Sequence, residues 1–297
     1  MDLYYVGLLF ISFISSYILT SSIMKKMINV KYGIDLHKKE KTKVAEMGGI
    51  APVSVNIGVL SILNPAVSIV MALSGIVGIV DDIAKLSPWQ KLILLGLIGI
   101  PAGLLLDFNL IKIISLILGI SIVSNLTNML AGFNGLEIGL GIISSFFIGL
   151  VLLLKGDFSG FQIVMVFTAS YLGFFMLNKY PAKVFPGDVG TLPIGAFLAT
   201  IAVWKDIIPQ LVIVLTPYLL DAFLKYYTAG VTKREDHKPT TLKNGKLYVE
   251  GGYLSLPRLI LKKKPMKEYE IVWVLWSISA FFGILSLIYT TTQLRCI

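Results

Sequence analysis

Long apolar runs recur along almost the whole of this 297-residue chain, and they restrict its fold more than any other feature. A membrane-crossing helix needs about 20 mainly apolar residues. Hydrophobic residues make up 56% of the chain and charged residues only 14%, which excludes an ordinary soluble domain. The sequence therefore predicts an all-α polytopic membrane bundle of about ten transmembrane helices, built as a single domain over residues 1–297. The predicted spans lie near 3–23, 48–63, 65–80, 91–106, 110–128, 137–154, 161–178, 189–204, 209–228 and 271–291.

The basic residues gather on one side of these spans. All but four of the 26 Lys and Arg residues lie in the breaks that follow odd-numbered runs or at the edges of those breaks. By the positive-inside rule these breaks are cytoplasmic loops, and both termini lie outside. The predicted cytoplasmic loops cover about 24–47, 81–91, 129–136, 179–188 and 229–270. The net charge of +9 therefore describes one membrane face, and nucleic-acid binding is disfavoured because no soluble recognition module is present.

Acidic and amide residues gather at the cytoplasmic ends of the odd-numbered spans. A transporter coupled to ions usually places ionisable groups near the bilayer midplane. Here the span interiors hold almost none, which weighs against a lipid-linked sugar or ion transporter. Several distant loops converge on one membrane surface, and such a surface suits a reaction between a water-soluble substrate and a lipid headgroup. The residues concerned are Asp81, Asp82, Asn125, Asn128, Asp188 and Asp221.

The adjacent carboxylates of Asp81 and Asp82 repel each other at an apolar boundary unless a cation compensates them. Lys85 and Lys91 are the nearby candidates. The alternative is a helix end with solvated acids. A pair of acids alone is a weak signal, and its meaning depends on the other segments.

The segment SNLTNMLAGFNGLE carries a second group of polar residues. Asn125 and Asn128 are three residues apart and share a helical face, while Gly132 and Gly135 flank Asn134. Amide groups serve as metal ligands or as hydrogen-bond partners of a base edge, and glycines let a ligand approach the backbone. Hydrogen bonding between helices is the alternative interpretation.

The segment NKYPAKVFPGDVGTLP places Asp188 in a turn that opens the eighth span. This carboxylate suits Mg²⁺, which takes one or two protein oxygens and fills its shell with phosphate and water. The alternative is a simple helix cap. In the long ninth loop, Arg234, His237 and Lys238 form a compact group of donors suited to phosphate oxygens, although loop residues of this kind are often only solvated.

Taken in this order, the segments resemble the polyprenyl-phosphate N-acetylhexosamine-1-phosphate transferases, a ten-helix family of membrane enzymes. NLTNMLAGFNGLE is especially similar to the eukaryotic dolichyl-phosphate members, because Ala131 stands where bacterial relatives usually have an aspartate. DLHKKEKTKVAEMGG also resembles the eukaryotic nucleotide-sugar loop. The resemblance covers essentially the whole chain. Together with a Lys- and Ile-rich composition it favours an archaeal source.

The resemblance implies a role for each matched position. It implies Mg²⁺, with Mn²⁺ as a substitute, held by Asn128 and Asp188, and it makes Asp81, Asp82 and Asp188 the catalytic acids. The implied nucleotide-sugar positions are Ile34, Asp35, Leu36, Glu46, Gly132, Asn134, Arg234, His237 and Lys238. The implied lipid-phosphate positions are Lys91, Asn125 and Asn128. The role of Arg234 is open, because the loop is about one residue shorter than the eukaryotic pattern and has Asp236 in place of an arginine.

The expected reaction transfers N-acetylglucosamine-1-phosphate from UDP-N-acetylglucosamine to a polyprenyl phosphate such as dolichyl phosphate, with release of UMP. This would be the first membrane step of lipid-linked glycan assembly, with N-glycosylation as the expected pathway. The nearer alternative uses undecaprenyl phosphate or another UDP-hexosamine for envelope polysaccharide. The enzyme is expected in an archaeal cell membrane with its site facing the cytoplasm. Its oligomeric state is open, with a homodimer as one alternative.

Overall fold

The computed structural model describes residues 3–38, 42–230 and 240–295, most of which are helical. The helices are α1 Leu3–Met27, α2 Ile50–Leu63, α3 Pro65–Ala84, α4 Pro88–Leu97, α5 Gly99–Leu105, α6 Leu110–Met129, α7 Leu136–Leu154, α8 Phe158–Asn178, α9 Asp188–Trp204, α10 Ile208–Val214, α11 Thr216–Ala229, α12 Leu256–Lys263 and α13 Glu268–Arg295. The strands are β1 Tyr32–Asp35, β2 Thr42–Ala45, β3 Thr241–Lys243 and β4 Lys246–Tyr248.

Every predicted apolar run coincides, to within two residues, with one of these helices or with a broken pair of them. Within the described residues, seven helical segments are long and apolar enough to cross a membrane, with α4 and α5 taken together as one. The bent pair α10 and α11 would add an eighth, and α2 and α9 are shorter apolar helices. The structure therefore supports an integral membrane bundle, while the count of ten crossings stays a prediction.

Proline explains the two broken segments. Its ring removes a backbone N–H and collides with the carbonyl four residues earlier. Pro101 accordingly follows the end of α4 at Leu97 by four residues, and Pro217 follows the end of α10 at Val214 by three. The chain bends by 64° between α10 and α11.

The chain is mostly helical, as the all-α prediction expects, and two small hairpins are its regular β-structure among the described residues. β1 pairs antiparallel with β2, and β3 with β4, so the predicted loops 24–47 and 229–270 contain regular structure. The second loop also contains the short helix α12. The β3–β4 turn is formed by Asn244 and Gly245, both with positive φ, which is a strong sequence signal for a two-residue hairpin turn.

The predicted cytoplasmic loops are shorter in the structure because the flanking helices continue further. α3 includes Asp81 and Asp82 and ends at Ala84, so the loop predicted at 81–91 reduces to residues 85–87. Ser87 caps the start of α4 in a capping box. Its hydroxyl accepts the Gln90 backbone N–H, and the Gln90 side chain accepts the Ser87 backbone N–H. The loops predicted at 129–136 and 179–188 likewise reduce to 130–135 and 179–187.

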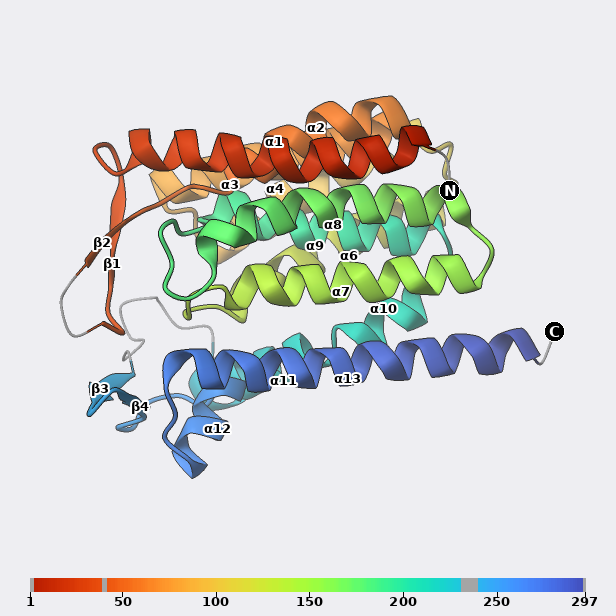
Figure 1. Cartoon of the computed structure of the whole chain (residues 1–297). Helices are drawn as coiled ribbons and strands as arrows, with labels where there is room; N and C mark the ends of the chain where they lie inside the picture. The colour runs from red at the N-terminus through yellow and green to blue at the C-terminus, as the bar shows by residue number, and fades with distance from the viewer. Residues whose placement is uncertain (1–2, 39–41, 231–239, 296–297) are drawn as a thin grey trace.

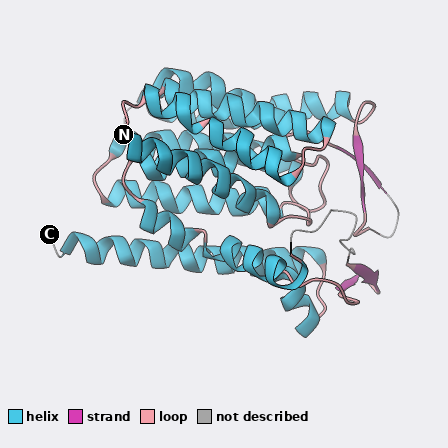
Figure 2. Cartoon of the chain, turned by 180° about the vertical axis from the view of Figure 1, so that it is seen from behind, coloured by secondary structure: helices cyan, strands magenta, loops and turns pink. Residues whose placement is uncertain are grey.

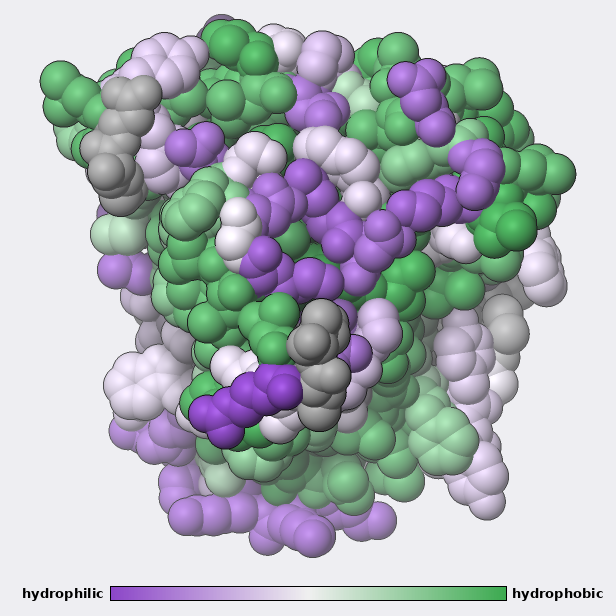
Figure 3. All heavy atoms as spheres, turned by 90° about the vertical axis from the view of Figure 1, so that its right-hand side faces the viewer, coloured by the Kyte–Doolittle hydropathy of each residue, from purple (hydrophilic) through white to green (hydrophobic). Residues whose placement is uncertain are grey.

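α9 lies in the middle of the bundle, and all of its residues from Asp188 to Val203 are buried, mainly against α3 and α6. Both termini lie at one end of the bundle and the hairpins lie at the other (Figure 1), an arrangement that is also visible from behind (Figure 2). Hydrophilic side chains also gather across the end that carries the termini (Figure 3), where ion pairs of 2.8 Å join Lys112 to Asp206 and Lys205 to Asp157. The hairpins belong to the predicted loops 24–47 and 229–270, so theirs is the end that the charge pattern predicts to be cytoplasmic.

Candidate active site

Two glycines let α9 approach its neighbours closely enough to assemble the candidate site. A Cβ atom added at Gly78 of α3 would lie 2.4 Å from the Val189 Cα, and one added at Gly195 of α9 would lie 2.4 Å from the Ser124 Cα of α6. Small residues at helix interfaces permit such close backbone packing. Asp82 lies one turn after Gly78 and therefore reaches the first turn of α9.

Asp82 caps the start of α9. Its Oδ1 accepts the backbone N–H of Asp188 at 3.0 Å, and its Oδ2 accepts that of Val189 at 3.1 Å. A carboxylate is stabilising at a helix N-terminus, where backbone N–H groups are otherwise unpaired. Lys31 donates to the backbone carbonyl of Asp82 from the segment before β1. Asp82 thus holds the start of α9, and with it the carboxylate of Asp188, in position.

Lys91 is the cation that compensates the acidic residues. Its Nζ lies 2.8 Å from the Asp188 Oδ2 and also pairs with Asp81. The second Asp81 oxygen accepts the Leu86 N–H at 2.8 Å. Asp81, Lys91 and Asp188 are only 4%, 8% and 8% exposed, so the three charges are largely removed from water. Of the two candidate lysines, Lys85 instead ends α3 in a left-handed conformation.

Asn128 meets Asp188 across α6 and α9. Its Nδ2 donates to the Asp188 Oδ2 at 3.3 Å, and its Oδ1 accepts the Thr191 hydroxyl at 2.9 Å. Asn128 lies one turn after Ser124 and Thr191 one turn before Gly195, so the close helix contact produces both bonds. The Asn125 amide instead donates to the Ser121 carbonyl of its own helix at 2.8 Å. The structure therefore brings Asn128, but not Asn125, into contact with the acidic group.

The Asn128 and Asp188 side chains fit a magnesium site by their chemistry. They supply an amide oxygen and a carboxylate from two helices, and both are hard oxygen donors. Both side chains adjoin the Lys91 ammonium. An anionic substrate at this place would therefore meet both the bound cation and the charge of Lys91.

A second group of polar residues surrounds the 130–135 loop. Asn134 donates its backbone N–H to the Glu268 Oε1 at 2.7 Å and its side-chain Nδ2 to the Asp35 Oδ2 at 3.0 Å. The Gly132 N–H donates to the Glu137 Oε1 at 3.1 Å, and Gly132 has a φ of +115° that favours glycine. This loop is held by carboxylates from β1, α7 and α13.

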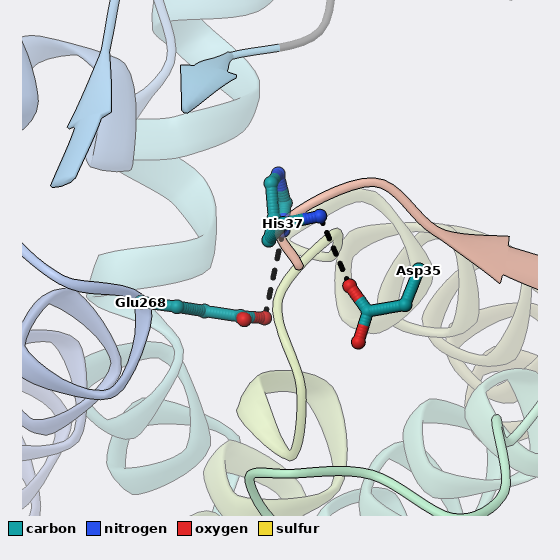
Figure 4. Close-up of side chains that lie close together, drawn as sticks. All are labelled: Asp35, His37 and Glu268. Carbon is teal, nitrogen blue, oxygen red and sulfur yellow. Dashed lines mark hydrogen bonds and ion pairs between the residues drawn. The ribbon is translucent and has the colours of Figure 1, made fainter. Parts of the chain in front are cut away.

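Asp35, His37 and Glu268 lie close together at this loop (Figure 4). Each residue offers one atom that could bind a metal ion, and these three atoms lie within 4.8 Å of one another. This is the group of potential metal ligands found among the described residues. However, Lys38 already lies 3.2 Å from the Asp35 Oδ2, the His37 N–H donates to its Oδ1 at 3.0 Å, and His37 Nδ1 lies 3.5 Å from Glu268. We interpret the group as a hydrogen-bonded cluster.

The pKa of Asp35 reflects these contacts. Burial raises the pKa of this carboxyl, but the hydrogen bonds from Asn134, from the His37 N–H and from Lys38 outweigh burial, so the pKa lies below its usual value of 3.8. Asp35 is therefore an ionised hydrogen-bond acceptor at neutral pH.

The β1–β2 hairpin connects the two polar groups. The Phe185 N–H donates to the Ala45 carbonyl at 2.8 Å, which attaches β2 to the segment just before Asp188. Glu46 follows β2 and lies 3.8 Å from Lys31. A Cβ atom at Gly33 would lie 2.7 Å from the Glu46 Oε1. Ile34 and Leu36 have exposed side chains on the same hairpin.

Three predicted site residues lie outside the part of the chain that the structure describes, and the sequence analysis missed other residues of the site. Arg234, His237 and Lys238 lie outside the described residues. Thr191 and Glu268 were missed: Thr191 is one hydroxyl in an apolar run, and Glu268 lies in a charged stretch before the last span, so neither stands out. Glu137 is the last residue of the segment SNLTNMLAGFNGLE, but the sequence analysis did not single it out.

Comparisons with known proteins show which family the chain belongs to. Residues 64–205 match the model of glycosyl transferase family 4. A putative glycosyltransferase of Methanocaldococcus jannaschii is 59% identical over 284 residues, which cover 94% of both chains. A putative UDP-N-acetylglucosamine–dolichyl-phosphate N-acetylglucosaminephosphotransferase of Saccharolobus solfataricus is 31% identical over 96% of both chains. A phospho-N-acetylmuramoyl-pentapeptide-transferase of Streptococcus thermophilus is 27% identical over 73% of this chain and 72% of its own. The chain therefore belongs to glycosyl transferase family 4, among the membrane-embedded polyprenyl-phosphate hexosamine-1-phosphate transferases.

Proposed function

We propose that this enzyme transfers N-acetylglucosamine-1-phosphate from UDP-N-acetylglucosamine to dolichyl phosphate or a similar polyprenyl phosphate. The observation that carries the proposal is the meeting of Lys91, Asn128 and Asp188 from three helices, with Asp188 2.8 Å from Lys91 and 3.3 Å from Asn128. The group lies at the hairpin end of the bundle. The similarity to the Saccharolobus relative, whose name gives this donor and acceptor, supports the proposal.

The reaction is a displacement at phosphorus. An oxygen of the lipid phosphate forms a bond to the β-phosphorus, and the bond from that phosphorus to the bridging oxygen breaks, so UMP leaves with the bridging oxygen. A phosphate monoester has a second pKa of about 6 and is mostly dianionic at neutral pH. The nucleophile therefore needs no general base, and the main task is to stabilise the charge that develops on the diphosphate.

Asn128 and Asp188 would hold Mg²⁺, or Mn²⁺ as a substitute, and the ion would neutralise the diphosphate oxygens when bound. Lys91 supplies a fixed positive charge beside them. Asp82 holds the α9 N-terminus, and Thr191 holds the Asn128 amide. Asp81 also pairs with the Lys91 ammonium and so helps to anchor it beside Asp188.

The nucleotide sugar would lie between the β1–β2 hairpin and the 130–135 loop. Ile34, Asp35 and Leu36 offer the hairpin backbone there, and Glu46 adjoins the segment that leads to Asp188. Gly132 and Asn134 belong to the loop. Arg234, His237 and Lys238 would bind the sugar and diphosphate from the ninth loop.

The site would face the cytoplasm of an archaeal cell, because it lies at the basic end of the bundle. The product would be polyprenyl diphosphate-N-acetylglucosamine, the start of a lipid-linked glycan for protein glycosylation. A second candidate is a transferase for envelope polysaccharide that uses undecaprenyl phosphate or another UDP-hexosamine. The similarity to a phospho-N-acetylmuramoyl-pentapeptide-transferase favours this candidate.

The test is to incubate purified protein with labelled UDP-N-acetylglucosamine, Mg²⁺ and either dolichyl or undecaprenyl phosphate, and to identify the lipid product by mass spectrometry. We expect Asp188→Ala and Asn128→Ala to abolish Mg²⁺-dependent UMP release while the protein stays folded. Asp206→Ala is the matched control, because this exposed acid follows the end of α9 that is remote from Asp188. Sugar movement without UMP release, or full activity of either site variant, would contradict the proposal.

A further inference from the structure

The side-chain amide of Asn134 is held in one of its two orientations by Asp35. Asn134 is only 5% exposed, and its Nδ2 lies 3.0 Å from the Asp35 Oδ2. An ionised carboxylate only accepts hydrogen bonds, so the amide nitrogen must face Asp35 and the amide oxygen must face away. A rotated amide would place two oxygens opposite each other in a buried setting, which is unfavourable.

The Asn134 oxygen is consequently presented as an acceptor. Among the residues that the structure describes, none donates a hydrogen bond to the Asn134 Oδ1. Lys38 keeps Asp35 charged, because its Nζ lies 3.2 Å from the same Oδ2, and the Asp35 Oδ1 is already bonded to the His37 N–H. The orientation of the amide is therefore decided by a charged pair and not by the ligand.

We propose that Asp35 is a positioning residue that selects uracil over cytosine by fixing the Asn134 amide oxygen toward the base. This inference rests on the proposed function, in which a uridine nucleotide binds at the 130–135 loop. Uracil carries a hydrogen on N3 and can donate to the Asn134 Oδ1, whereas cytosine has a lone pair at N3. Cytosine would thus set an acceptor against an acceptor, at the cost of one unsatisfied buried hydrogen bond.

Glu268 provides an internal comparison. It accepts the backbone N–H of Asn134 at 2.7 Å, so it holds the main chain of the loop and not the amide orientation. Glu268→Gln keeps an oxygen for this bond. It is therefore expected to change the affinities for uridine and cytidine nucleotides in the same proportion.

The experiment measures the affinities of the purified full chain for UMP and CMP by calorimetry. Wild type should prefer UMP, and Asp35→Asn should reduce the UMP-to-CMP ratio by about tenfold, because an amide at residue 35 can present either its oxygen or its nitrogen to Asn134. The exchanged pair Asp35→Asn with Asn134→Asp should restore the preference. The carboxylate introduced at residue 134 offers acceptors both to the base and to the amide introduced at residue 35, so the bond between the two positions is retained.

The outcomes separate the two proposals. If wild type binds neither nucleotide, the proposed function fails, and this inference fails with it. If wild type prefers UMP but Asp35→Asn has the same ratio, only the inference is overturned. An equal affinity of wild type for both nucleotides also overturns it. If Asp35→Asn does not fold, the double variant Asp35→Asn with Asn134→Asp is measured in its place. A folded double variant that binds UMP no more tightly than CMP would contradict the role of Asp35.

Discussion

Replacing Gly195 with alanine tests whether the close approach of α6 and α9 builds the site. The new Cβ would lie 2.4 Å from the Ser124 Cα and N and 2.4 Å from the Val123 carbonyl oxygen, whereas ordinary contacts begin at 3.4 Å. All three atoms belong to the backbone, so no side chain can rotate away. The two helices must therefore move apart by about 1 Å, or the backbone must distort.

This separation acts directly on Asn128. Its bond to Asp188 is already 3.3 Å long, and its bond to Thr191 is 2.9 Å. A displacement of about 1 Å at a reacting geometry typically costs about a hundredfold in rate. We expect Gly195→Ala to lower kcat for UMP release by about that factor. We also expect overpacking to reduce stability by about 1–3 kcal/mol.

Gly119→Ala is the matched control, because this glycine of α6 also lies in the contact with α9. A Cβ atom there would lie 3.5 Å from the Ala199 Cβ and 3.9 Å from Val203, which are ordinary contacts. Alanine also favours helix over glycine by about 1 kcal/mol, so this variant should be fully active and at least as stable as wild type. Thermal unfolding in detergent and UMP release measure both effects. Equal activity of Gly195→Ala and Gly119→Ala would refute the argument.

Three further predictions concern the charged residues. Asp82→Ala removes the carboxylate that accepts two N–H groups of α9 and should cost about 1–2 kcal/mol, measured by thermal unfolding, and Asp82→Asn should cost less; equal losses would exclude a capping role. Lys91→Met removes the cation that pairs with both Asp81 and Asp188, so the melting temperature should fall. Millimolar Mg²⁺ should then raise the melting temperature of the variant more than that of wild type. An equal rise in both proteins would argue against a cation site here. The folded-state pKa of Asp35 lies below 3.8, so the contribution of this carboxylate to stability is fully present above about pH 4 and is lost as pH falls through the folded pKa. Asp35→Asn should lack this part of the pH dependence of the unfolding free energy. Identical pH profiles of the variant and wild type would contradict the prediction.

The amino-acid sequence alone determines the helices of this protein, although the breaks inside the predicted spans 91–106 and 209–228 were not predicted. Each predicted apolar run is helical, and Pro101 and Pro217 follow the two interruptions, because these features depend on residues close together in the chain. The Asn244-Gly245 turn is equally local and was available in the sequence, although the all-α prediction passed over it. Helix ends were less accurate, as the placement of Asp81 and Asp82 inside α3 shows.

The tertiary structure alone decides which polar side chains meet. Lys91 and Lys85 are both close to Asp81 in sequence, but only Lys91 lies between Asp81 and Asp188, which is 97 residues away from this lysine. Asn125 and Asn128 share a helical segment, yet only Asn128 contacts Asp188. These choices depend on how closely α9 packs against α3 and α6, which the backbone contacts at Gly78 and Gly195 set. Such contacts between distant segments have no local pattern, because they arise only when the helices pack.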